Sequence, residues 1–312
     1  HRSVIFEDLL GQATQLVREL YQLPNHFEVL WVPGGASTQL AVAPMNLLEQ
    51  GESMAFIESG FWAQKAMEAT SELRAVELVA SSRKDSFKKL PYPIQMSTKS
   101  KFLHLSSNET IEGLQYNNYP DIGLHLVLDM TSDFLARPLP LDRVAVAFAS
   151  AQKNFGIAGI TCVLVNTNYL DHSKSKSIPS IFNYQTHIKN KSLYHTLPTF
   201  PLYMSLLALQ WIKDQGGVSQ MESNATLRSN RLYQTIDAHP RLDSVALEDR
   251  SRMNVCFKTH SLEDQEALKE RFMNQNIYGI NGFPTIGGFR ASMYNFMPMD
   301  SVDELIKILN EF

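Results

Sequence analysis

Two short apolar runs enclose the most informative stretch of this 312-residue chain. The first begins at Val144, and the second covers residues 160–165. Such runs of valine, alanine and isoleucine are typical of strands buried on both faces, as in a parallel sheet covered by helices. Between them lies one charged residue, Lys153, in a loop of small residues. This pattern predicts an α/β fold with a lysine at the end of a core strand.

A carboxylate is expected close to this lysine. Another apolar run, residues 124–128, ends in Asp129. In an open α/β sheet, ligands bind beyond the carboxyl ends of the strands, where Asp129 and Lys153 would be neighbours. Pyridoxal phosphate needs such a pair, a lysine to hold its aldehyde and a carboxylate to keep its pyridine nitrogen protonated. Spacing alone is explained equally well by a helix-capping aspartate and a solvated loop lysine.

Longer motifs favour the cofactor interpretation. Residues 149–161 closely resemble the cofactor-lysine segment of the phosphoserine aminotransferases, which are fold-type-I pyridoxal phosphate enzymes. Residues 129–138 resemble their pyridine-aspartate segment, and five further stretches match in order over nearly the whole chain. The resemblance implies a large domain with a mostly parallel, seven-stranded mixed sheet flanked by helices. It also implies a smaller α+β domain at the C-terminal end.

The resemblance assigns the cofactor contacts. Residues 33–39 follow a predicted strand and precede a helix expected from about Leu40 to Leu48, and a helix N-terminus suits a phosphate. From the residues alone, the glycine pair is a plain turn, Trp62 a core residue and Thr110 a helix cap. Lys153 and Asp129 are the predicted catalytic residues. The cofactor-binding residues implied by the resemblance are Ala36, Ser37, Trp62, Thr110, Asp129, Gln152, Lys153, His195 and Thr196.

Two loops are expected to serve a second subunit. Residues 178–184 and 192–200 resemble family loops that reach across a dimer interface. In the family, an asparagine and a threonine there bind the cofactor phosphate of the partner. Thr196 retains the threonine, and His195 stands in place of the asparagine and can still donate a hydrogen bond. The resemblance thus implies a homodimer with shared active sites.

The substrate end of the site departs from the family. The Gly-Gly-x-Arg-Ala-Ser motif is intact, which makes Arg290 the expected clamp for the substrate α-carboxylate. Just upstream, the family has a histidine and an arginine that bind the substrate phosphate, and this chain has Phe283 and Pro284. The other basic pair of that subsite, contributed by the partner subunit, corresponds to His1 and Arg2.

Several functions therefore stay open. One is a phosphoserine aminotransferase of serine biosynthesis that uses glutamate and 2-oxoglutarate and rebuilds its phosphate site from His1, Arg2, His195 and a basic residue near Lys99. Another is a divergent aminotransferase with an apolar pocket at Phe283. A third is a non-catalytic homologue that binds the cofactor. A binding or structural protein without cofactor is the remaining class.

Composition limits the other possibilities. The length predicts one large and one smaller domain, and the glycine pair at 216–217 before a long expected helix places their boundary near Gly216, with the large domain over residues 1–215 and the small one over residues 216–312. The chain begins at His1, whereas the family carries several tens of residues before the corresponding point, so we expect a preceding segment outside this numbering. Two cysteines indicate free thiols in a reducing, cytoplasmic compartment. A net charge of −4 argues against nucleic-acid binding, no apolar run is long enough for a membrane, and no metal site is expected.

Overall fold

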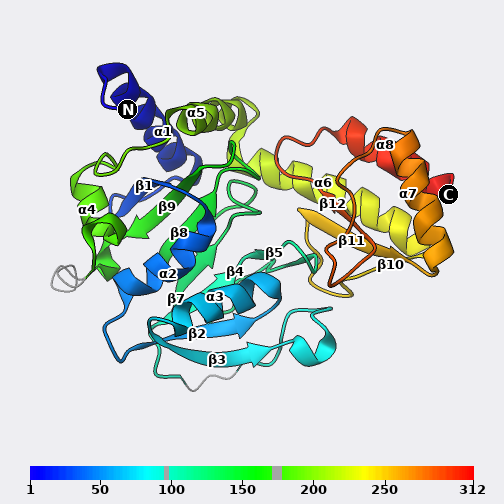
Figure 1. Cartoon of the computed structure of the whole chain (residues 1–312), viewed down its shortest axis with the longest axis horizontal. Coiled ribbons are helices and arrows are strands. Elements are labelled where there is room, and N and C mark those ends of the chain that lie inside the picture. Colours follow the sequence, from blue (N-terminus) through cyan, green and yellow to red (C-terminus); the bar gives the residue numbers. More distant parts are fainter. Residues whose placement is uncertain (95–97, 171–177) are drawn as a thin grey trace.

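A computed structural model describes residues 1–94, 98–170 and 178–312. Its largest sheet has seven strands in the order β1-β9-β8-β7-β4-β2-β3 (Figure 1). β9 runs antiparallel to both of its neighbours, and the remaining pairs are parallel. The mostly parallel, seven-stranded mixed sheet is therefore confirmed. The strands are β1 (Phe27–Pro33), β2 (Ser53–Glu58), β3 (Ala75–Ser81), β4 (Phe102–Ser106), β7 (His125–Asp129), β8 (Val144–Ser150) and β9 (Ile160–Asn166).

Helices cover both faces of this sheet, which explains why its central strands are apolar without alternation. Trp31 of β1 packs in one core cluster with α1 and α5, and its neighbours Leu30 and Val32 pack in a second cluster with α2 and α3. Successive side chains of a strand point to opposite faces, so both faces are buried. The helices of this large unit are α1 (Val4–Tyr21), α2 (Ala36–Leu47), α3 (Phe61–Ser71), α4 (Tyr184–Lys189) and α5 (Thr199–Asp214), with 3₁₀ turns η1 (Arg83–Asp85), η2 (Thr167–Tyr169) and η4 (Ser180–Phe182).

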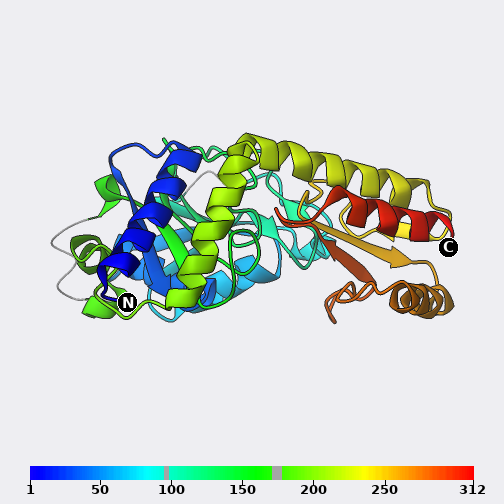
Figure 2. The ribbon, with the colours of Figure 1, turned by 90° about the horizontal axis from the view of Figure 1, so that it is seen from above.

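A smaller unit follows, as expected. Its antiparallel sheet contains β10 (Leu242–Ser244), β11 (Asn254–Thr259) and β12 (Phe289–Ser292). Helices α7 (Leu262–Asn274) and α8 (Met299–Asn310) pack with this sheet around a separate apolar cluster that contains Phe257, Phe272 and Phe289. Figures 1 and 2 show this unit beside the large one, with the long helix α6 (Gly217–Ala238) leading into it. The smaller α+β unit of the prediction is thus present.

Helix α6 belongs to both cores. Val218 and Met221, near its start, pack in the cluster of the large unit, whereas Leu232 and Ile236 pack in that of the small unit. The helix follows Gly216, whose φ of 103° lies in the left-handed region that favours glycine. The domain boundary at residue 216 stays a prediction. None of the helices in the described ranges combines the length and hydropathy needed to cross a membrane.

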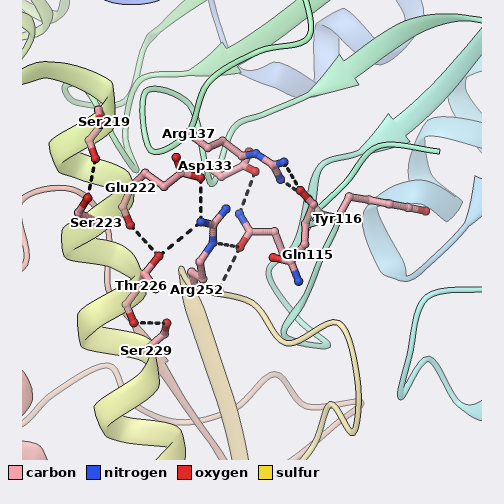
Figure 3. A network of polar contacts seen from close by, with 11 residues as sticks. Gln115, Tyr116, Asp133, Arg137, Ser219, Glu222, Ser223, Thr226, Ser229 and Arg252 are labelled. Carbon is pink, nitrogen blue, oxygen red and sulfur yellow. Dashed lines mark hydrogen bonds and ion pairs between the residues drawn. The ribbon is translucent and has the colours of Figure 1, made fainter. Parts of the chain in front are cut away.

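A partly buried polar network joins the two units (Figure 3). Arg252 takes part in two of these contacts. Its Nη1 atom lies 2.9 Å from Oε1 of Glu222 on α6, and the backbone N–H of Arg252 donates to Oε1 of Gln115 at 3.0 Å. The Nε2 atom of Gln115 in turn donates to Oδ2 of Asp133 at 3.1 Å. Burial raises the pKa of Asp133, and nearby Arg137 opposes that shift. Since each group depends on the next for a partner, the network fixes the small unit against the loops of the large sheet.

Candidate active site

A cavity lies at the carboxyl ends of the central strands. β7 ends at Asp129, β8 ends three residues before Lys153, and the two strands are parallel neighbours. The predicted cofactor-binding residues line this cavity, with the exception of His195 and Thr196, which were expected to serve the partner subunit. Its lining residues are Gly35, Ala36, Ser37, Leu40, Trp62, Ser106, Asn108, Thr110, Asp129, Thr131, Ser132, Gln152 and Lys153.

The amine of Lys153 is held among polar and aromatic groups. Its Nζ atom donates to Oγ1 of Thr110 at 2.9 Å and lies 5.8 Å from the ring centre of Trp62. Thr110 follows β5 (Asn108–Glu109) and precedes β6 (Leu114–Gln115), so it lies in the turn of a hairpin rather than at a helix cap. The ring of Tyr294, 6.0 Å from Nζ, completes the surroundings. Sequence reasoning missed Tyr294, whose only signal is its position four residues after Arg290.

Asp129 is buried and only partly hydrogen-bonded. Its Oδ1 atom accepts bonds from the backbone N–H of Thr131 at 3.0 Å and from the Thr131 hydroxyl at 2.7 Å. Within the described residues, no hydrogen bond reaches Oδ2. Burial raises the pKa of this carboxyl, and the Thr131 bonds and the positive charge of Lys153 oppose the shift only in part. A cationic N–H in the cavity would therefore be a favourable partner for Asp129.

The N-terminus of α2 also faces the cavity. The helix begins at Ala36, four residues earlier than predicted, so Ala36 and Ser37 belong to its first turn. The preceding turn contains Gly34 at φ 95°, and no side chain caps the helix. Uncapped N–H groups and the positive end of the helix dipole suit an anion such as a phosphate. The glycine turn thus leads into a helix N-terminus that suits an anion.

Trp62 forms one wall of the cavity. Its side chain is half-buried, which favours a ring exposed to a ligand over a ring packed in the core. The indole Nε1 atom is buried and has no hydrogen-bond partner among the described residues. An indole N–H is a donor that usually finds a partner when it is buried. The unsatisfied donor indicates that a polar group belongs beside it.

The small unit supplies Arg290 and Phe283. Arg290 lies on β12 opposite Cys256 of β11, and its Nε atom is buried without a partner in the described parts of the chain. It does not line the cavity itself. Phe283 lies in the loop before β12, and its ring centre is 5.5 Å from that of Phe61, the residue beside Trp62. The small unit thus supplies a guanidinium whose Nε atom has no partner among the described residues, and an aromatic ring.

The residues expected to serve the partner lie outside this cavity. His1, Arg2, His195 and Thr196 are exposed. The Nε2 atom of His1 is 3.5 Å from Oγ1 of Thr196, so two of the four residues meet although they are far apart in sequence. His195 borders a separate hollow that also contains Gln39. No residue of this set completes the cavity of its own chain.

The aldehyde, the ring nitrogen and the phosphate of pyridoxal phosphate each have a counterpart in the cavity. The Lys153 amine suits the aldehyde, Oδ2 of Asp129 suits the ring nitrogen, and the first turn of α2 suits the phosphate. The unsatisfied indole of Trp62 lies on the same cavity. This match and the fold define the class, the pyridoxal-phosphate-dependent enzymes of α/β architecture.

Comparison with known proteins narrows the class. The family model for class-V aminotransferases matches residues 1–305. The phosphoserine aminotransferase of Alkalihalobacillus alcalophilus is 37% identical over the whole chain and 88% of its own length. A solved phosphoserine aminotransferase, studied for radiation damage of its Schiff base, superposes with a TM-score of 0.95 at 37% identity, over 100% of this chain and 88% of the other. The phosphoserine aminotransferase of Trichomonas vaginalis with bound cofactor has a TM-score of 0.92 at 29% identity, over 99% and 89%.

The chain belongs to the class-V aminotransferase family. It is a transaminase that uses pyridoxal phosphate and acts on an amino acid and a 2-oxo acid. The family, cofactor and enzyme class expected from the sequence are confirmed.

Proposed function

We propose that this protein exchanges the amino group of phosphoserine with 2-oxoglutarate, a reaction of serine biosynthesis. The chemistry rests on one observation, the presence of Lys153 and Asp129 in the same cavity. The choice of substrate is supported by relatives named phosphoserine aminotransferases, which are 34–37% identical over the full chain. It is further supported by the basic pair His1 and Arg2, since arginine and histidine bind phosphates well.

The residues of the cavity have separate tasks in this proposal. Pyridoxal phosphate, when bound, supplies an aldehyde that takes up the amino group and a ring that stabilises negative charge at the α-carbon. Lys153 would take the proton from the substrate α-carbon through Nζ, as a general base, and deliver it to the aldehyde-derived carbon of the cofactor, as a general acid. Thr110 orients Nζ through the 2.9 Å bond. Asp129 keeps a proton on the ring nitrogen, and Trp62 fixes the ring plane and excludes water.

Arg290 completes the proposal by holding the substrate α-carboxylate. Its planar guanidinium can donate two parallel hydrogen bonds to the two oxygens. The buried Nε atom, which has no partner among the residues that the structure describes, supports this role. A carboxylate would remove the cost of that unsatisfied donor.

A homodimer with shared sites is part of the same proposal. His1, Arg2, His195 and Thr196 are exposed, lie outside the cavity of their own chain and carry groups that bind anions. The segments around them expose large apolar side chains, which a second copy would cover. These side chains are Val4, Ile5, Ile181, Phe182 and Phe200. Sedimentation of the purified protein tests this part, and a monomer at micromolar concentration would contradict it. A cytoplasmic location is proposed only from the two buried free thiols.

A second candidate substrate is an amino acid without a phosphate. It is favoured by the contact of Phe283, at a position where the family has a basic residue, with Phe61, whose ring in turn contacts Trp62. Rates of the first half-reaction with phosphoserine and with a panel of unphosphorylated amino acids separate the candidates. Negligible activity on phosphoserine, with turnover of another amino acid, would favour the second. Cofactor absorbance without any half-reaction would instead indicate a non-catalytic homologue.

A further inference from the structure

Two buried carboxyl groups lie beside the cavity and have no task in the mechanism. Glu109 and Glu112 flank Thr110 in the β5–β6 hairpin and are 0% and 3% exposed. Neither forms an ion pair within the described parts of the chain. Both face the start of α3, the helix that presents Trp62. Buried carboxyl groups without a cation are costly unless hydrogen bonds or a proton compensate.

The two groups are bonded in different ways. Glu109 uses both of its oxygens, since Oε2 accepts the backbone N–H of Trp62 at 2.9 Å and Oε1 accepts that of Ala63 at 3.0 Å. Oε1 also accepts the hydroxyl of Ser59 at 3.1 Å. Glu112 uses only Oε1, which accepts the backbone N–H of Phe61 at 3.0 Å. Its Oε2 atom is buried without a partner in the part of the chain that the structure describes.

Gly60 shows how closely the two groups are packed. A Cβ atom added there would lie 2.8 Å from the carboxyl carbons of both Glu109 and Glu112, and 2.6 Å from Oε2 of Glu112. The φ of Gly60 is 171°, an extended conformation that any residue adopts. The backbone therefore does not require glycine at this position. The space that a side chain would need is filled by the two carboxyl groups.

Electrostatics assigns unequal protonation to the pair. Two carboxylates in one buried space strongly disfavour double ionisation. Burial raises the pKa of both groups, and the bonds from the Trp62 and Ala63 N–H groups and the Ser59 hydroxyl oppose that shift at Glu109. The negative charge is most stable where N–H donors and the positive end of a helix surround it, which describes Glu109. A proton is best placed on Glu112, whose Oε2 accepts no bond.

We propose that Glu109 is a positioning residue for the cofactor site. Its carboxylate fixes the first turn of α3 and hence the ring of Trp62, which forms one wall of the cavity, while Glu112 remains protonated beside it. The same hairpin carries Thr110, which contacts Lys153, so one short segment fixes two sides of the cavity. The inference rests on the proposed role of Trp62 as the wall of the cofactor site.

Matched amide variants test the asymmetry. Glu109→Gln replaces one of two accepting oxygens with an NH₂ group, which must oppose either the Trp62 or the Ala63 N–H. Glu112→Gln keeps the single accepting oxygen that Phe61 needs. In cofactor-free protein, amide hydrogen exchange of residues 60–66 should speed up about tenfold or more in Glu109→Gln and stay unchanged in Glu112→Gln. Equal protection in both variants, or loosening only in Glu112→Gln, would overturn the proposal.

A second variant covers the case in which Glu109→Gln does not fold. Gly60→Ala leaves the backbone unstrained and pushes both carboxyl groups away from the helix, so it should also loosen residues 60–66. Titration of the cofactor-free variants with pyridoxal phosphate should show affinity weakened about tenfold in Glu109→Gln and Gly60→Ala and unchanged in Glu112→Gln. Fast amide exchange of residues 60–66 together with unchanged affinity for pyridoxal phosphate would show that the first turn of α3 does not position Trp62. The exchange measurement needs no turnover, so it stands even if the proposed substrate is wrong.

Discussion

The amine of Lys153 lies 2.9 Å from the hydroxyl oxygen of Thr110, across a cavity whose floor contains Asp129. The three residues come from the loop after β8, the turn of the β5–β6 hairpin and the end of β7. The hydrogen bond to Thr110 thus fixes the orientation of the amine in the cavity. Such preorganisation lowers the entropic cost of reaching the reactive geometry.

Replacing Lys153 tests the proposed proton transfer. Lys153→Ala should lose the visible absorbance of the lysine-bound cofactor and lower turnover by about 10²–10⁴-fold or more, because a general base contributes that much. Steady-state kinetics and an absorbance spectrum of the purified variant measure both effects. Thr110→Val is the matched comparison and should have a smaller effect, since it removes only the orienting bond. Near-normal turnover in Lys153→Ala would show that the residue is wrongly assigned.

Asp129→Asn should separate stability from activity. Burial raises the pKa of Asp129, so its ionised form is unfavourable in the folded, cofactor-free chain. The neutral amide removes that cost, and the cofactor-free variant should melt at the same temperature as the parent or higher. Its kcat should fall about 100-fold, as expected for loss of a charge partner worth about 3 kcal/mol. A large fall in melting temperature would mean that the carboxylate is needed for folding.

Restoring the basic pair tests the identity of the substrate. The double variant Phe283→His, Pro284→Arg should raise kcat/KM for phosphoserine about 10- to 100-fold for each phosphate bond that forms, because charge-assisted bonds contribute about 1.5–3 kcal/mol. Phe283→Leu with Pro284 unchanged controls for loss of the contact to Phe61. Rates on an unphosphorylated amino acid should not rise. An unchanged preference would indicate that these positions do not face the substrate side chain.

The buried pair predicts a pH dependence of stability. Burial raises the pKa of Glu112 to about 7, so the folded chain keeps a proton there that the unfolded chain releases. The free energy of unfolding should therefore fall as the pH rises above the ordinary carboxyl range of about 4.5, by up to about 1.4 kcal/mol per pH unit for this proton. Burial also raises the pKa values of Cys256 and Tyr116, which interact with the pair electrostatically, so these two groups stay neutral in that range. Glu112→Gln should show a flatter profile in urea titrations at pH 5 to about 8.

The polar network that joins the two units predicts the effect of replacing one of its members, Gln115. Gln115→Leu leaves the Arg252 N–H and Oδ2 of Asp133 without their partner, which should lower the free energy of unfolding by about 1–3 kcal/mol. Ser223→Ala, on the exposed side of α6, removes a bond that water replaces and should change stability by about 0.5 kcal/mol or less. Thermal melts of both variants provide the comparison. Equal melting temperatures would show that the network contributes little.

The sequence predicted the central pair for a clear physical reason. Asp129 and Lys153 each follow an unbroken apolar run, and parallel strands bring such ends together. The other cavity residues were reached through family resemblance, because a glycine turn or a lone tryptophan has no specific pattern. The early start of α2 at Ala36 was missed, since the helix has no side-chain cap to mark it.

Contacts between distant segments were beyond sequence reasoning. Tyr294 meets Lys153, and Phe283 meets Phe61, only because the small unit folds against the large one. The difference between Glu109 and Glu112 depends on which oxygen faces which N–H of α3, a matter of distances that spacing does not encode. Residue types alone would have made the two glutamates equivalent.

Strand β9, which runs antiparallel to its neighbours, connects the bend that carries Lys153 with the glycine turn before α2. Its Thr161 hydroxyl donates to the Gly34 carbonyl at 2.9 Å, and the Gly159 carbonyl accepts the Gly34 N–H at 2.9 Å. The bend that carries Lys153 is thus clamped by sheet pairing at both ends, with Thr161 opposite Ser150. An inserted or deleted residue in this bend would slide β9, exchange its inner and outer side chains, and pull on the glycine turn before α2. The length of the lysine bend is consequently as constrained as its chemistry.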